Sequence, residues 1–114
     1  MTRRDDPTSL RHMFDHAREA VHMAAGRGRN DLKQDRMLEL ALVRLVEIVG
    51  EAAARVSNDG RQRYGAIPWP EVRGLRNRLV HGYDTVDLDI LWDIIHDDLP
   101  PLIVELERIL SSAH

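Results

Sequence analysis

LELALVRLVEIVGEAAARV, residues 38–56, is the stretch that decides the fold of this chain. Its apolar side chains cover most of the circumference of a helix, which is typical of the central helix of a bundle. The residues that follow, SNDG at 57–60, have the chemistry of a turn. We therefore expect a helix that begins near Asp31, ends near Val56 and forms the centre of the molecule.

A second amphipathic helix precedes this stretch. Asp6-Pro7 is a helix-start signal, with Asp as the N-cap and Pro at the first helical position. Apolar residues at helical spacing then continue to about Ala25, where GRGRN at 26–30 interrupts them. On the other side of the central helix, residues 61–70 read as a short irregular connection.

Two further helices are expected downstream. Pro70 opens the third, with apolar residues on one face, and Gly82 is well placed to stop it. Asp87 can cap the fourth, whose apolar stripe continues to Leu110.

Pro100-Pro101 interrupts the fourth helix. It predicts either a kink or a restart, with Asp97 or Asp98 as the new cap and the prolines in the first turn. The fold expected for residues 1–114 is therefore a single all-α domain, an up-down bundle of four to five helices with short connections.

Composition excludes several classes of function. The chain has 114 residues, of which 43% are hydrophobic and 31% charged, and it has no cysteine. Disulfides, thiolate metal sites and a cysteine nucleophile are therefore excluded. The start lacks an apolar signal core, and no run of about 18 apolar residues is present to span a membrane. A cytoplasmic location is the default expectation.

Charge is distributed unevenly along the chain. Residues 55–83 carry six Arg against two acids, a net charge of +4, whereas residues 84–114 carry eight acids against one Arg, a net charge of −7. The basic zone is compatible with a local phosphate site, and equally with a solvated helix pair of opposite charge. The acidic third of the chain is a candidate docking surface for a basic partner.

The segment RNRLVHGY at 76–83 carries the pattern R-x4-H-x-Y. R-x4-H alone means little, because Arg11 and His16 repeat the spacing. Only the second copy has a tyrosine two residues on, at Tyr83, which lowers the chance expectation to roughly one in a hundred. The alternative interpretation of this segment is purely structural: a helix terminus with a cationic cap and a packed tyrosine.

These side chains suit cleavage of RNA. Histidine can act as general base or acid near neutral pH. Arginine grips a phosphate bidentately or stabilises its developing charge. Together, His81 and Arg76 match attack of a neighbouring 2′-OH on phosphate, which needs no metal.

Helix geometry adds a condition. Five residues along an ideal helix turn by about 140°, so Arg76 and His81 do not share a face. They converge only if the helix ends near residues 80–82 or if a second subunit completes the pocket. Each chain also offers one histidine here, while acid–base cleavage is easiest with two proton-transfer groups. Both points favour a symmetric dimer.

Other residues near the motif have several possible roles. Asn77 can orient His81 or bind substrate, and Arg73 can lie in solvent or steer RNA phosphates. Glu47 lies in an apolar run, where an unpaired carboxylate is costly, so we expect it to pair with an arginine of the motif helix. Gly50 is expected to allow close helix packing. No metal or cofactor is expected.

The stretch IPWPEVRGLRNRLVHGYDTVDLDILWDIIHDDLPPL, residues 67–102, closely resembles HepT, the toxin branch of the HEPN superfamily. The run LALVRLVEIVGEAA at 40–53 is similar to that family's second helix. The resemblance covers roughly residues 10–110. It implies a four- to five-helix bundle that dimerises with the motifs at a shared cleft.

The resemblance also implies a function. HepT-like proteins are metal-independent ribonucleases restrained by a cognate MNT-type nucleotidyltransferase antitoxin. Arg76 and His81 would be catalytic, and Tyr83 would be the residue to which the antitoxin adds AMP groups. A different class remains open, since the chain could be a non-catalytic adaptor that binds a nucleotidyltransferase and presents Tyr83. A plain structural bundle is the third possibility.

Overall fold

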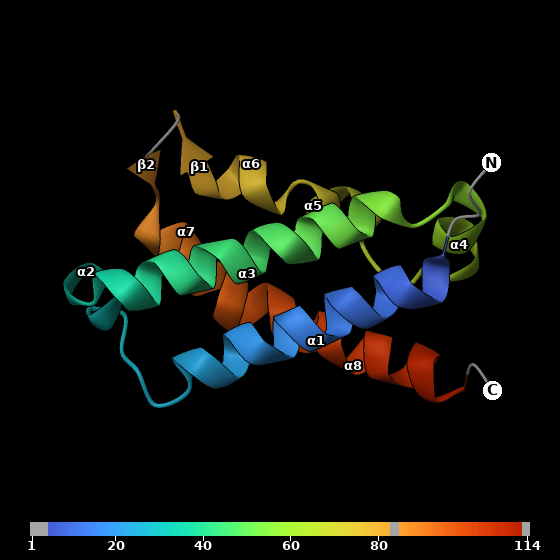
Figure 1. The fold of residues 1–114 in the computed structure, drawn as a ribbon, viewed down its shortest axis with the longest axis horizontal. Coiled ribbons are helices and arrows are strands. Elements are labelled where there is room, and N and C mark those ends of the chain that lie inside the picture. Colours follow the sequence, from blue (N-terminus) through green and yellow to red (C-terminus); the bar gives the residue numbers. More distant parts are fainter. Residues whose placement is uncertain (1–4, 83–84, 113–114) are drawn as a thin grey trace.

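A computed structural model describes residues 5–82 and 85–112 and shows an all-α bundle, as predicted. Its long helices are α1 (Asp6–Ala24), α3 (Arg36–Arg55) and α8 (Leu99–Ser111). The helix α1 packs along α3 and also against α8 (Figure 1). Leucine, isoleucine, valine, alanine and methionine side chains from these helices make most of the buried core. No helix of the described residues is long and apolar enough to cross a membrane.

The first helix begins at Asp6, one residue earlier than predicted. Asp5, not Asp6, is its N-cap and accepts the Thr8 amide at 3.2 Å. Asp6 instead accepts hydrogen bonds from the Ser57 amide at 3.0 Å and the Ser57 hydroxyl at 2.6 Å. Because Asp6 is occupied by a contact with a residue 51 positions away, the carboxylate of Asp5 acts as the cap in its place.

The central helix is divided near its start. The short helix α2 (Asp31–Gln34) ends at Asp35, and Asp35 then caps α3 by accepting the Leu38 amide at 3.0 Å. The prediction of a single continuous helix from residue 31 is therefore wrong at Asp35. The Asp35 side chain accepts a hydrogen bond from a nearby backbone amide, and this bond competes with continuation of the helix through residue 35.

A short helix, α4 (Asn58–Arg63), replaces the first part of the expected irregular connection. Ser57 caps it by accepting the Gly60 amide at 3.0 Å. Gly60 packs against the first helix, where an added Cβ would lie 2.5 Å from an Asp6 carboxylate oxygen. A glycine is required there by this close approach.

The third helical segment is shorter than predicted and is broken. It consists of α5 (Trp69–Arg73) and α6 (Leu75–Leu79), separated at Gly74, and it stops before Gly82. The chain continues as β1 (Val80–His81), which pairs antiparallel with β2 (Thr85–Val86), the hairpin at the top of Figure 1. Gly82 lies in the hairpin turn with a φ of +75°, a conformation that glycine adopts readily.

The last segment is interrupted by a π-helical turn. The helix α7 (Leu88–Asp93) is capped by Asp87, as predicted, and η1 (Ile94–Asp98) joins it to α8. The Leu99 amide donates to the Ile94 carbonyl, five residues back. Proline lacks an amide donor and its ring clashes with the carbonyl four residues back, so Pro100-Pro101 favours this wider turn. The prolines lie in the first turn of α8, one of the two predicted arrangements, but Asp98 makes no capping hydrogen bond.

Candidate active site

Buried leucines fix the helix that carries the motif. Leu75 and Leu79 of α6 are four residues apart and almost completely buried. Residues between them therefore face outward. The preceding helix α5 packs close to α3, since a Cβ on Gly50 would lie 3.3 Å from the Val72 carbonyl oxygen. The expected role of Gly50 in close packing is confirmed.

Arg76 pairs with the central helix. Its Nε lies 3.4 Å from Glu47 Oε2, and Arg44 Nη1 lies 3.4 Å from the other carboxylate oxygen, Oε1. Arg44 also lies 3.5 Å from Glu51. The predicted pairing of Glu47 with an arginine of the motif helix is confirmed. Arg44, three residues before Glu47, was not anticipated, although that spacing places both on one helix face.

His81 faces a carboxylate across the hairpin. Its Nε2 lies 3.8 Å from Asp87 Oδ2, while Oδ1 of Asp87 accepts the Ile90 amide at 3.0 Å. Asp87 was predicted only as a helix cap. Its second contact depends on the hairpin: His81 pairs with Thr85, and Asp87, two residues after Thr85, lies diagonally across from His81 on the same face.

The helix ends between Arg76 and His81, which is one of the conditions for their convergence. Both side chains are open to solvent, with exposed fractions of 58% for Arg76 and 60% for His81. The motif therefore forms an exposed surface and not an enclosed pocket.

Of the other predicted residues, Asn77 and Arg73 take no part in the ion pairs of Arg76 and His81. Asn77 and Arg73 are exposed, and neither side chain has a hydrogen bond or ion pair to another described residue. The neighbouring Arg78 pairs with Asp98, with its Nη1 2.6 Å from Asp98 Oδ2. Tyr83 lies outside the described residues.

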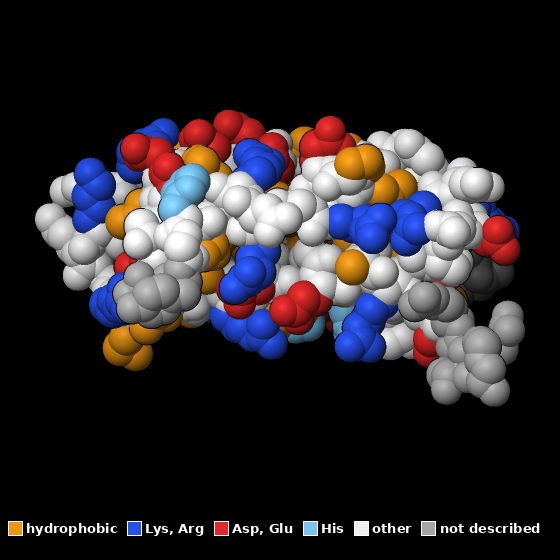
Figure 2. All heavy atoms as spheres, turned by 90° about the horizontal axis from the view of Figure 1, so that it is seen from above, with side chains coloured by type: hydrophobic (Ala, Val, Ile, Leu, Met, Phe, Trp, Pro, Cys, Tyr) orange, Lys and Arg blue, Asp and Glu red, His pale blue; other side chains and the backbone are white. Residues whose placement is uncertain are grey.

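The view onto α5, α6 and the hairpin shows the electrostatic character of this side (Figure 2). Lys and Arg side chains are spread along its length, and Asp and Glu side chains gather along one long edge. Within residues 5–82 and 85–112, no three His, Asp or Glu side chains are arranged to hold a metal ion. The site thus offers a fixed cation and an imidazole, which are suited to phosphate binding and proton transfer.

Comparisons with known proteins agree with this chemistry. A family profile described as "Ribonuclease HepT-like" matches residues 13–109. A Methanocaldococcus jannaschii protein named "Putative RNase" is 33% identical over 94% of this chain and 98% of its own length. A Thermococcus cleftensis protein named "Probable ribonuclease HepT" is 34% identical over 69% of this chain and 72% of its own length. No solved structure matches the chain significantly. The chain belongs to the HepT-like ribonuclease family.

Proposed function

We propose that the protein is the toxin component of a HepT/MNT toxin–antitoxin system and a metal-independent endoribonuclease, with Arg76 and His81 as its catalytic residues. The observation that supports this most directly is the exposed placement of both residues where α6 passes into the hairpin. Glu47 holds the arginine and Asp87 faces the histidine. Family membership supports RNA as the substrate.

The proposed reaction is an internal transfer at phosphorus. The 2′-oxygen of one ribose forms a bond to the adjacent phosphorus as His81 takes its proton, and the bond to the 5′-oxygen of the next nucleotide breaks. A second acid protonates that leaving oxygen, which gives a 2′,3′-cyclic phosphate and a free 5′-hydroxyl. Arg76 stabilises the charge that develops on the non-bridging phosphate oxygens.

A homodimer supplies the second proton-transfer group, because a second copy contributes a second His81. An apolar surface beside the motif supports this assembly. Met37 and Leu40 of α3 are 81% and 52% exposed. Leu40, Arg44 and Glu47 follow one another at helical spacing, so the exposed apolar residues share a face with the partner of Arg76.

The proposed antitoxin is an MNT-type nucleotidyltransferase that adds AMP groups to Tyr83. Tyr83 follows His81 by two residues, so a bulky anionic group on it would lie beside the motif. Such a group would repel RNA phosphates and block access to His81. This part of the proposal rests on the sequence motif and the family resemblance.

The test is RNA cleavage by the dimer purified without its partner, in EDTA. We expect cleavage by the wild type, and losses of about 10²–10⁴-fold in His81→Ala and comparably large losses in Arg76→Ala. Tyr83→Phe should remain active and resist AMP transfer. The chain provides a matched control, because Arg11→Ala and His16→Ala alter the same R-x4-H spacing on α1 and should leave cleavage unchanged.

Three results would contradict the proposal. Cleavage that persists in His81→Ala removes the histidine from the mechanism, and cleavage that requires added metal removes metal independence. If the wild type is inactive while mass spectrometry shows unmodified Tyr83, the non-catalytic adaptor is the better account.

A further inference from the structure

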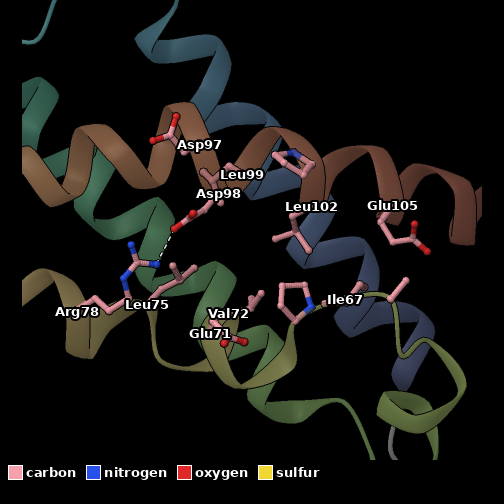
Figure 3. Close-up of a pocket in the computed structure, with 13 residues that line it drawn as sticks. Ile67, Glu71, Val72, Leu75, Arg78, Asp97, Asp98, Leu99, Leu102 and Glu105 are labelled. Carbon is pink, nitrogen blue, oxygen red and sulfur yellow. Dashed lines mark hydrogen bonds and ion pairs between the residues drawn. The ribbon is translucent and has the colours of Figure 1, made fainter.

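A groove of about 440 Å³ lies on the side of α6 that faces α8. Its floor is apolar and includes Ile67, Val72, Leu75, Leu99 and Leu102, all buried by their packing in the core. Figure 3 shows these side chains between α5–α6 on one wall and η1–α8 on the other. None of the described residues that line the groove belongs to the hairpin.

The groove is separate from the catalytic motif. Arg76 and Arg78 are two residues apart on α6, which turns them by about 200° relative to each other. Arg76 pairs with Glu47 of α3, whereas Arg78 lines the groove and pairs with Asp98 at 2.6 Å. Neither Arg76 nor His81 lines it.

The rim of the groove is acidic. The charged residues that line it are four acids, Glu71, Asp97, Asp98 and Glu105, and one base, Arg78, a net charge of −3. Arg78 is already paired with Asp98, and Glu105 pairs with Arg108. Glu71 and Asp97 are exposed and form no ion pair with any other described residue. Two carboxylates therefore remain unneutralised beside an apolar floor.

We propose that this groove binds a short basic segment of a different protein. One aliphatic side chain of that segment would occupy the apolar floor, and its Arg or Lys side chains would pair with Glu71 and Asp97. Apolar burial supplies affinity, and the charges supply specificity and orientation. The proposal does not depend on the assignment of catalytic residues, since the two sites share none.

Charge and symmetry decide between occupants. RNA is disfavoured because the rim would repel its phosphates. A second copy of this chain would have to insert its own basic region into the acidic groove. In the proposed dimer the second copy lies at the face of α6 that bears Arg76, about 200° from Arg78, and so it leaves the groove open. A segment of a different protein can bring basic residues to the groove while the dimer is in place.

The walls of the groove are fixed in advance. Pro68 lies on one wall and Pro101 on the other, and the leucines between them belong to the core. A preformed groove loses little conformational freedom when it is filled, which favours binding of a short segment.

The test starts from a random library of 12-residue peptides displayed on phage and selected against the immobilised full chain. We expect the enriched peptides to carry Arg or Lys on both sides of a Leu, Ile or Val. One enriched peptide is then synthesised with a fluorophore, and its Kd is measured by fluorescence anisotropy. Replacing its aliphatic residue by Ser should weaken binding about tenfold or more.

Charge reversal in the protein locates the site. The double variant Glu71→Lys/Asp97→Lys should raise the Kd about tenfold or more. The matched control is Glu19→Lys/Glu107→Lys, which changes the net charge equally at exposed acids outside the groove and should leave the Kd within about twofold. Circular dichroism checks that both variants keep the helical content of the wild type.

Three results would overturn the proposal: no peptide is enriched, the enriched peptides are acidic or uncharged, or both double variants weaken binding equally. Equal weakening would show a general attraction to an acidic protein and not a site. RNA cleavage is a separate readout, so failure here leaves the ribonuclease proposal standing.

Discussion

Glu47 contacts two arginines, Arg76 of the motif and Arg44 of its own helix. One carboxylate oxygen lies 3.4 Å from Arg76 and the other 3.4 Å from Arg44. Its side chain is only 20% exposed, while those of the two arginines are about 60% exposed. Glu47 is therefore the least exposed member of the group and is placed to hold Arg76 in one orientation for phosphate binding.

Replacing Glu47 tests this positioning role. We expect Glu47→Gln to slow RNA cleavage about tenfold, because the guanidinium of Arg76 loses its fixed partner. RNA affinity should not fall, since the change removes a negative charge beside two arginines. The measurement is single-turnover cleavage together with a separate RNA-binding titration.

Glu51→Gln is the matched control for this prediction. Glu51 contacts Arg44 at 3.5 Å and makes no ion pair with Arg76. Its replacement removes the same charge one helical turn away and should change the cleavage rate less than about twofold. Equal slowing in both variants would assign the effect to net charge and not to the orientation of Arg76.

Asp35 sets the boundary between two helices. Asp35 ends α2 and caps α3, the helix that carries Glu47. The Leu38 amide that donates to its carboxylate, followed by the hydrogen bond from Arg27, lowers the pKa of Asp35 below its ordinary value. A lowered carboxyl pKa in the folded state stabilises the protein above the unfolded pKa and stops doing so as the pH falls through the folded pKa.

The cap therefore predicts a pH-dependent stability difference. At pH 7, Asp35→Ala should unfold at lower urea concentration than the wild type. The difference should shrink as the pH falls below about 4, where the carboxylate becomes protonated. Asp35→Asn keeps an oxygen that can accept the Leu38 amide, so it should fall between the two at pH 7. A wild-type advantage that stays constant down to pH 2 would contradict this account.

The helix α6 has two faces with different surroundings in the folded molecule. One bears Arg76 and lies beside the exposed apolar residues of α3, and the other bears Arg78 and borders the acidic groove. The first suits RNA and a second copy of the chain, and the second suits a basic protein segment. The two proposed interactions could therefore occur at the same time.

The assembly is tested by placing a charge on the proposed dimer surface. Wild type should sediment at twice the chain mass of 13.1 kDa. Leu40→Asp buries a carboxylate in the interface, which costs about 3 kcal/mol and raises the dissociation constant about a hundredfold. It should sediment as a monomer and lose cleavage.

Val104→Asp is the control for a charge on an exposed apolar residue. Val104 lies on α8 and is 68% exposed, compared with 52% for Leu40. This variant should remain dimeric and active. A monomeric wild type with full activity would exclude the dimer from the mechanism.

The sequence by itself determined the helical architecture, because burial of an apolar stripe depends on local spacing. Residues 38–56 predicted the central helix, and Asp87 was correctly identified as a cap. It also determined the family, since the motif and its flanking residues are contiguous in the chain. Its errors lie where a local cap or turn competes with helix, as at Asp35, at Ser57 and after Leu79.

Only the tertiary structure decided what surrounds the motif. The sequence predicted that Glu47 pairs with an arginine of the motif helix, but only the packing of α6 on α3 selects Arg76, 29 positions away, as that arginine. Asp87 faces His81 because a hairpin forms between them. Arg78 is neutralised by Asp98 only because α6 lies beside the π-helical turn. Such pairings follow from packing between elements, and the periodicity of one segment carries no information about which charged residue another segment will bring to it.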